Sequence, residues 1–236
     1  GFDPTYEGEN PRVTRDYFGP DLGISGKGLI LRHVLEHIYD PIAFLHQLAQ
    51  ANGRQGLVYI EVPCFDWICK NRAWFDIFYE HVNYFRLMDF KRMFGRIVHA
   101  DWVFGGQYLA IVADLATLHD PEINNKDRAT FPDNFNIVIP AKSQADKIIV
   151  WGGASKGVIF SLLCERAGFP VANVIDINPA KQGKYLAATG LQVQSPKQAL
   201  ADVPYGSTIY VMNPNYLEEI RLFSQNKYNY VEMSND

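Results

Sequence analysis

The stretch GLILRHVLEHIYDPIAFLHQLAQANGRQGLVYIEVP, residues 28–63, decides the fold class. Its apolar run at 28–33 is typical of a buried strand, and a second run of this kind lies at 57–62. Between them, Asp40 suits the N-cap of a helix over 41–51 that starts with proline. The order strand, helix, strand implies a parallel pair of strands joined by a crossover, and it predicts an α/β fold.

The rest of the chain predicts two α/β units joined by a linker. Residues 64–85 are aromatic and irregular, which favours a loop with short helical turns over a cleft. The polar stretch 119–146 contains three prolines and is typical of a linker. After it, the glycine-rich turn WGGASKG, residues 151–157, follows a strand and opens a helix. The further strands are expected at 107–114, 147–151, 171–176 and 207–212, and the further helices at 86–95, 156–167 and 214–224.

Composition excludes several classes of protein. The 236 residues are 47% hydrophobic and 20% charged, which is ordinary for a globular protein with a packed core. The formal net charge is -4 and the basic residues are scattered, so we expect no nucleic-acid partner. No apolar run approaches the ~20 residues of a membrane span and no secretory signal opens the chain, so we expect no membrane partner. Three irregularly spaced cysteines fit a reducing cytoplasm, where we expect the protein.

The segment from His33 to His37 contains H-x-x-E-H, a zinc-protease pattern. That pattern binds zinc on a helix, where positions i and i+4 share a face. Here His33 ends a strand and the helix begins only after Asp40, so we expect the two imidazoles not to converge and no metal to bind. A metal-dependent hydrolase using His33, His37 and a distant glutamate is an alternative. Because ligands of open α/β sheets bind outside the carboxyl ends of the strands, His33 is also a candidate ligand-binding residue.

The segment FYEHVNYF, residues 78–85, places a histidine beside an acid among aromatic residues. The Glu80 carboxylate can orient the His81 imidazole or raise its basicity, which is how a general base is tuned. A histidine with the ordinary pKa of ~6.5 can take a proton at neutral pH. The alternative interpretation is an aromatic core segment with a satisfied histidine.

The glycine-rich turn predicts an anion-binding helix N-terminus, to which Lys156 adds positive charge. Asp176 ends the next expected strand, where a ribose-binding acid often lies. The glycines do not follow the G-x-G-x-x-G spacing, so we do not expect NAD binding, and the alternative is a turn needed for packing. Near the start of the chain, Asp3 and Asp16 are candidate partners of a ribose diol and an adenine amino group.

Together these motifs resemble the S-adenosylmethionine-dependent sugar C-methyltransferases of deoxysugar pathways. The matching strings occur in the family's order and span nearly the whole chain. FYEHVNYF and DINPAKQGKY are specific to the family, whereas WGGASKG alone is not. The other matching strings are FDPTYEG, RDYF, RHVLEHIYDP, IEVPCFDW and MNPNYLEEI.

The resemblance implies an enzyme of three parts: a cysteine-rich zinc domain, a methyltransferase domain that binds the cofactor, and a C-terminal Rossmann-like domain. We expect this chain to begin inside the second part, without the zinc cysteines, the first strand or its glycine-rich cofactor loop. The expected domains are a partial methyltransferase domain over 1–118 and a Rossmann-like substrate domain over 147–236. Two departures from the family are Ala187-Ala188, where Pro-Gly is usual, and Phe78, where an active-site tyrosine is common.

The chemistry that the resemblance implies is proton abstraction beside the ketone of a 4-keto nucleotide sugar, followed by attack of the enolate carbon on the methyl group of S-adenosylmethionine. His81 is then the base, and Glu80 and His37 are neighbours that orient it or stabilise charge. The cofactor-binding candidates are Asp3, Asp16, Tyr17, Phe18 and His33. The substrate-binding candidates are Phe78, Tyr79, Tyr84, Gly153, Lys156, Tyr185 and Asn213. The alternative function is that of a non-catalytic Rossmann-like fragment that binds a nucleotide or a partner protein.

Overall fold

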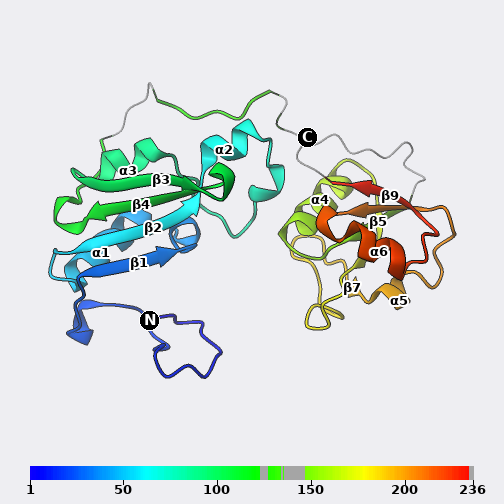
Figure 1. Ribbon diagram of the computed structural model, residues 1–236, viewed down its shortest axis with the longest axis horizontal. Coiled ribbons are helices and arrows are strands. Elements are labelled where there is room, and N and C mark those ends of the chain that lie inside the picture. The colour runs from blue at the N-terminus through cyan, green and yellow to red at the C-terminus, as the bar shows by residue number, and fades with distance from the viewer. Residues whose placement is uncertain (123–126, 134, 136–146, 234–236) are drawn as a thin grey trace. The chain divides into compact units, whose positions relative to one another are not determined.

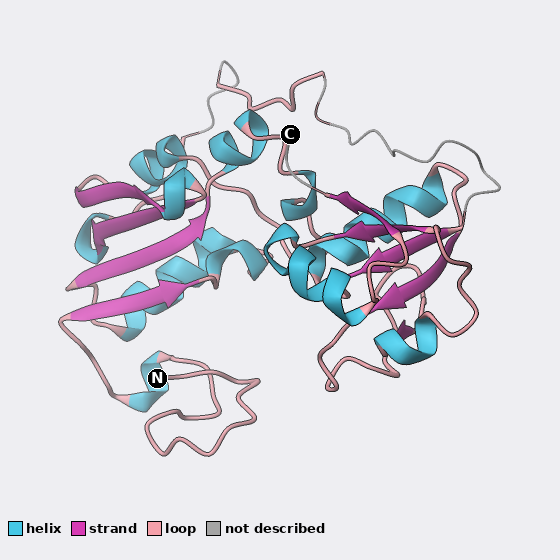
Figure 2. Ribbon diagram, turned by 45° about the vertical axis from the view of Figure 1, so that its right-hand side comes forward, coloured by secondary structure: helices cyan, strands magenta, loops and turns pink. Residues whose placement is uncertain are grey.

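The computed structural model describes residues 1–122, 127–133, 135 and 147–233. It divides the chain into two compact units (Figure 1), Gly1–Ile68 with Tyr79–Thr130 and Cys69–Phe78 with Phe131–Asp236. Each unit has one β-sheet with helices packed beside it, as Figure 2 shows with strands in magenta and helices in cyan. The α/β fold class is therefore confirmed. Within the described residues, no helix is both long and apolar enough to cross a membrane.

The sheet of the first unit has the strand order β1-β2-β4-β3. Strands β1 and β2 are parallel and joined by helix α1, whereas β4 is antiparallel to both β2 and β3. Helix α1 begins as predicted, because the Asp40 carboxylate accepts a hydrogen bond of 2.9 Å from the Ala43 N–H. The elements of this sheet and its helices are β1 (Gly28–Arg32), α1 (Pro41–Ala51), β2 (Leu57–Pro63), α2 (Phe65–Lys70), α3 (Leu87–Met93), β3 (Ile97–Val103) and β4 (Tyr108–Asp114).

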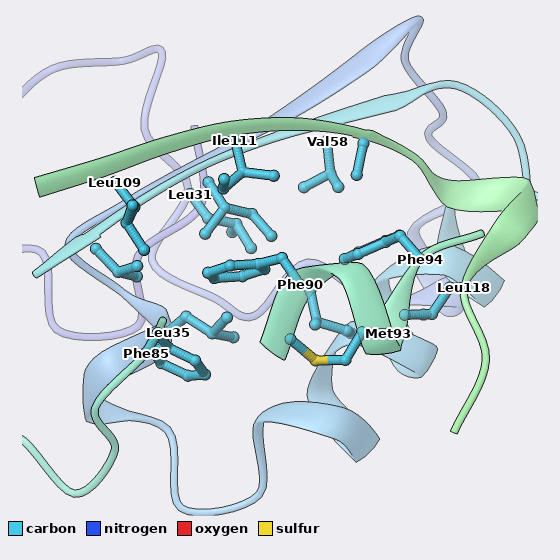
Figure 3. Close-up of a cluster of buried hydrophobic side chains, with 14 of the residues drawn as sticks. Leu31, Leu35, Val58, Phe85, Phe90, Met93, Phe94, Leu109, Ile111 and Leu118 are labelled. Carbon is cyan, nitrogen blue, oxygen red and sulfur yellow. The ribbon is translucent and has the colours of Figure 1, made fainter. Parts of the chain in front are cut away.

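Helix α3 anchors the chain that follows the aromatic segment. Phe90 is fully buried and points from α3 toward the sheet, among Leu31 of β1 and Ile111 of β4 (Figure 3). The ring of Phe85 lies 5.4 Å from that of Phe90, so the end of the aromatic segment joins the same core. Burial of one such phenylalanine contributes about 1.5–3 kcal/mol. This core therefore fixes where the segment before Phe85 can lie.

The sheet of the second unit has the order β7-β6-β5-β8-β9, and all its neighbouring strands are parallel. The first strand of the unit lies in the middle, which is the doubly wound, Rossmann-like arrangement. Ligands of such sheets bind outside the carboxyl ends of the strands, where the strand order reverses. The elements are β5 (Ile148–Trp151), α4 (Ser155–Arg166), β6 (Val171–Ile175), β7 (Val193–Gln194), α5 (Pro196–Ala199), β8 (Thr208–Val211), α6 (Leu217–Phe223) and β9 (Asn229–Glu232).

The segment Cys69–Phe78 belongs to the second unit, although the residues on both sides of it belong to the first. Its short 3-10 helix, Trp74–Asp76, packs on α4, and the Trp74 ring lies 6.3 Å from that of Phe160. The Lys156 ammonium lies 4.6 Å from the centre of the Phe75 ring and donates a hydrogen bond to the Met233 carbonyl. The stretch 64–85, expected as one loop, is thus divided between the two units.

The glycine-rich turn before α4 has a structural reason for its glycines. Gly152 has φ 124°, which L-residues rarely adopt. At Gly157, an added Cβ would lie 1.8 Å from the Gly152 carbonyl oxygen. The close packing of the turn on its own helix therefore requires glycine at both positions.

Ala188 carries backbone strain that a single substitution can relieve. It lies in an exposed turn with φ 67°, where an L-residue other than glycine costs about 1–2 kcal/mol. Glycine loses more entropy on folding, so we expect Ala188→Gly to raise the free energy of unfolding by about 0.5–1 kcal/mol. Ala187→Gly is the matched control, since Ala187 does not have a positive φ, and it should lower that free energy. Urea unfolding of both variants checks this, and a less stable Ala188→Gly variant would contradict the turn geometry.

Candidate active site

Three histidines and two glutamates gather where β1 and β2 end. This carboxylate–imidazole cluster consists of His33, Glu36, His37, Glu61 and His81. After β1 the chain turns at His33, which has φ 53°, and enters a one-turn 3-10 helix, Leu35–His37. Leu35 is fully buried in the core, and the adjacent Glu36 is buried with it, with 1% of its surface exposed. The cluster therefore lies at the carboxyl end of the parallel strand pair, where open α/β sheets bind ligands.

Backbone hydrogen bonds hold the aromatic segment against this 3-10 helix. The Glu36 carbonyl accepts hydrogen bonds from the N–H groups of Val82, at 2.9 Å, and Asn83, at 3.1 Å. In the other direction, the Nδ1 of His37 lies 2.9 Å from the Glu80 carbonyl oxygen. We call these three contacts the strap. They bring the His81 ring to 5.0 Å from the His37 ring, edge to face.

The strap determines which nitrogen of His37 faces the cluster. A carbonyl oxygen only accepts hydrogen bonds, so the Nδ1 of His37 must carry a proton to bond that of Glu80. In the neutral ring the lone pair then lies on Nε2, which is 4.0 Å from the Glu36 Oε1. One ligand atom each of Glu36, His37 and His81 lie within 4.8 Å of one another. The site thus joins two imidazoles and one carboxylate.

Glu36 is the most strongly desolvated acid of the cluster. Burial raises the pKa of its carboxyl, and the imidazoles of His37 and His33 oppose that rise. Its Oε2 atom is buried and accepts no hydrogen bond from the described residues. A buried carboxyl with an unpaired oxygen is costly, so it persists only where the surrounding fold holds it there.

Glu61 is the opposite case, although it is also buried. Hydrogen bonds from the Tyr59 hydroxyl and the Arg32 guanidinium lower the pKa of its carboxyl. His33 lies between the two acids, with Nε2 at 3.2 Å from the Glu61 Oε1 and Nδ1 at 3.5 Å from the Glu36 Oε1. Two neighbouring acids with pKa values moved in opposite directions are typical of sites that divide acid and base roles.

Glu80 contacts the cluster through its backbone. Its backbone carbonyl holds His37, whereas its carboxylate is exposed and interacts with the phenol of Tyr79. The carboxylate grouped with His81 is that of Glu36, which sequence reasoning did not select. The signal was present in H-x-x-E-H, but the residues that converge are Glu36, His37 and His81, because His33 and His37 do not share a helix.

The expected cofactor-binding residues near the start of the chain make local contacts. The Asp3 Oδ1 accepts hydrogen bonds from the N–H and hydroxyl of Thr5, which lower the pKa of its carboxyl. The Asp16 Oδ1 accepts one from the Tyr17 N–H, and the Tyr17 ring is largely exposed. Phe18 packs against the core of the first unit. His33, also an expected cofactor residue, belongs to the carboxylate–imidazole cluster through its contacts with Glu36 and Glu61.

The expected substrate residues of the second unit separate into two groups. Asn213 lines a cavity of about 280 Å³ at the carboxyl ends of β5, β6 and β8, beside Trp151 and Asp176. The Gly153 N–H donates a hydrogen bond of 2.9 Å to the Asp176 carboxylate at this edge. Lys156 instead lies in the contact with the segment Cys69–Phe78, as described above.

The remaining expected substrate residues make other contacts within their own units. Phe78 packs against the core of the second unit and Tyr185 is exposed. In the first unit, Tyr79 is exposed and the Tyr84 ring lies 6.3 Å from that of His81. Tyr84 therefore lies beside the cluster.

Comparisons with known proteins match both units. Residues 27–97 match a family model described as a methyltransferase domain, and residues 124–231 match one described as a C-methyltransferase C-terminal domain. The chain is also similar to C-methyltransferase NovU from Streptomyces niveus, with 24% identity over 226 residues that cover 83% of this chain and 54% of NovU. The chain thus spans about half the length of this curated relative.

The opposite pKa directions of the two buried acids predict opposite pH dependences of stability. With a raised pKa, Glu36 binds a proton more tightly in the folded chain, so it lowers stability as pH rises above its unfolded pKa of about 4.3. Glu61, with a lowered pKa, contributes stability above that pH and loses it as pH falls. We therefore expect Glu36→Gln to gain stability relative to the parent chain, and Glu61→Gln to lose it, as pH rises from about 4 to 7.

Urea unfolding across this pH range, with a chelator present, measures both differences. The two isosteric variants control for each other, because they remove the same charge at neighbouring sites. The same direction of change in both variants would contradict the electrostatics of the cluster.

Proposed function

We propose that this chain, which matches a methyltransferase domain model and a C-methyltransferase C-terminal domain model, serves the transfer of a methyl group from S-adenosylmethionine to a carbon of a nucleotide-linked keto-deoxysugar. The observation that carries the proposal is the edge-to-face pair of His37 and His81 beside the buried Glu36. A carbon next to a ketone becomes a nucleophile only when a base removes its proton, and histidine is the side chain most often used for that step.

His81 is the base in this proposal. Its side chain is half-buried, so it is neither sealed in the core nor fully hydrated. Its ring nitrogen takes the proton from the carbon beside the ketone, and the electrons of that C–H bond move onto the ketone oxygen as an enolate. The strap supports this role because it fixes the loop that carries His81, and a fixed base needs little reorganisation during the reaction.

His37 stabilises the charge that develops on the enolate oxygen. Its Nδ1 is committed to the Glu80 carbonyl, so its Nε2 is the atom available to the substrate. When Nε2 is protonated, the ring donates a charge-assisted hydrogen bond to that oxygen. The Glu36 carboxylate lies 4.0 Å from this nitrogen.

The residues present are compatible with S-adenosylmethionine in their donor and acceptor chemistry. The carboxylates of Asp3 and Asp16 each use Oδ1 in their own turns, and carboxylates accept hydrogen bonds from ribose hydroxyls and an adenine amino group. We propose these two acids, with Tyr17, Phe18 and His33, as the residues that hold the cofactor. Bound S-adenosylmethionine would supply an electrophilic methyl group to the carbon from which His81 removes the proton.

The second unit holds the nucleotide sugar in this proposal. Its cavity at the carboxyl ends of β5, β6 and β8 has aromatic walls from Trp151 and Tyr216 and polar groups from Asp176 and Asn213. Aromatic walls with a few oriented polar groups are typical of sites that bind ring-shaped ligands. We propose Gly153 and Tyr185 as further residues that contact the nucleotide sugar. Lys156 acts indirectly, because its ammonium lies over the Phe75 ring of the segment Cys69–Phe78.

The residue to substitute first is His81. We expect His81→Ala to lower methyl transfer to 4-keto nucleotide sugars by about 10²–10⁴-fold, the usual contribution of a general base, with cofactor affinity nearly unchanged. Exchange of the substrate proton beside the ketone for solvent deuterium, followed by NMR, should fall by the same factor. His46→Asn, which removes an imidazole paired with Asp120 outside the cluster, is the control and should keep both activities. If the His81→Ala variant still exchanges the substrate proton at the full rate, His81 is not the base.

Cofactor binding separates the enzyme from a non-catalytic binding module. S-adenosylhomocysteine at 100 times its dissociation constant should stabilise the intact gene product by about 2.7 kcal/mol, because a ligand of the folded state shifts the unfolding equilibrium. Thermal unfolding with and without the ligand measures this. A shift with a nucleotide but none with S-adenosylhomocysteine would favour the binding module.

A further inference from the structure

We propose that Glu36, His37 and His81 form a binding site for a divalent transition-metal cation of the zinc class. Their candidate ligand atoms lie within 4.8 Å of one another, and the three side chains come from two segments that the strap holds together. Binding of the cation itself does not depend on the proposed methyl transfer. A consequence for activity, given below, does rest on it.

The donor set matches this class of cation. Two imidazole nitrogens and one carboxylate oxygen are the ligands of many zinc sites with three protein ligands, in which water takes the fourth position. Magnesium and calcium prefer sites made of oxygen atoms, so they fit less well. The chemistry therefore favours Zn²⁺ and Co²⁺.

His37 is already held as a metal-ligating histidine is held. Such histidines usually donate their second ring N–H to a carbonyl or carboxylate, which fixes the tautomer and the ring orientation. The Nδ1 of His37 donates to the Glu80 carbonyl at 2.9 Å. Its Nε2, with the lone pair of the neutral ring, therefore faces the Glu36 carboxylate.

Glu36 supplies a second and independent observation. Its side chain is 1% exposed, and its buried Oε2 accepts no hydrogen bond from the described residues. Its Oε1 lies 4.0 Å from the His37 Nε2, so two electron-pair donors face each other. A bound cation accepts the lone pair of the His37 Nε2 and offsets the cost of a buried carboxylate, whose Oε1 otherwise contacts the His33 Nδ1 at 3.5 Å.

The adjustment needed for binding is small. Zinc ligands at about 2.0–2.2 Å from the metal lie roughly 3.4 Å apart in a tetrahedral arrangement. The three atoms must therefore approach by about 1 Å, which rotation of the partly exposed His37 and His81 rings can supply. Glu61 is unsuited as a further ligand, because Arg32 and Tyr59 already bind both of its oxygens.

The consequence for the proposed function is inhibition. A cation on His81 occupies the lone pair that otherwise takes the substrate proton. Zinc at this site therefore competes with proton abstraction, and removal of zinc by a chelator restores it.

Titration of the metal-free chain with Co²⁺ tests the site without any methyl-transfer assay. We expect one equivalent to bind, with the intense visible bands of a four-coordinate centre, and Zn²⁺ to displace it. Thiolate charge-transfer bands should be absent, since the three-residue site contains none of Cys64, Cys69 and Cys164.

Single variants identify the ligands. Glu36→Gln, His37→Asn and His81→Ala should each weaken Co²⁺ binding by at least about 100-fold, since loss of a mere outer partner costs 10–100-fold. His46→Asn is the matched control, because it removes an imidazole 2.9 Å from the Asp120 carboxylate and should leave binding unchanged. Far-ultraviolet circular dichroism shows whether Glu36→Gln folds. If it does not fold, His81→Ala tests the site instead, because His81 is only half-buried.

Each outcome separates this site from the proposed function. Absence of stoichiometric Co²⁺ binding, binding that survives His81→Ala, or binding that His46→Asn removes would overturn the metal site and leave the methyl-transfer proposal standing. Stoichiometric Co²⁺ binding together with full proton exchange in His81→Ala would support the metal site while removing His81 as the base.

Discussion

The strap between the 3-10 helix after β1 and the loop at 80–83 is the interaction on which the site depends. The Glu36 carbonyl accepts two backbone N–H groups from the loop, and the Glu80 carbonyl accepts the His37 ring N–H. Because both segments are also anchored in one core, through Leu35 and Phe85, the strap sets the distance between the imidazoles of His37 and His81. The chemistry proposed for the chain follows from that distance.

The parts of the fold that bury continuous apolar runs could be predicted from sequence, and the exposed edges could not. Strands β1, β2, β5 and β8 and helices α1 and α4 lie where their apolar runs and caps indicated. Strand β3 was missed, because it is an edge strand in which His99, Asp101 and Trp102 are exposed. Strands β7 and β9 were also missed, and each lies at an edge of its sheet: β7 has two residues, and the first and last residues of β9 are exposed.

The residues of the candidate site that lie in local sequence motifs could be selected from the sequence. His37 and His81 were selected from their motifs, but the burial of Glu36 was not, because it arises from the packing of the adjacent Leu35 into a core formed by distant segments. Lys156 and Phe78 were assigned to the substrate, whereas the structure places both in contacts within the second unit. Phe78 and the Phe75 ring beside Lys156 belong to a segment of ten residues that is part of the second unit, which no local pattern indicates.

The most direct test of this account is the tautomer of the His37 ring. Two-bond ¹⁵N–¹H NMR spectra, recorded at a pH where the ring is neutral, distinguish the protonated nitrogen from the bare one. The strap requires the proton on Nδ1, bonded to the Glu80 carbonyl, with a bare Nε2 facing the Glu36 carboxylate. A ring protonated on Nε2, with a bare Nδ1, would mean that the loop carrying His81 is not held against the 3-10 helix, and the account would be wrong.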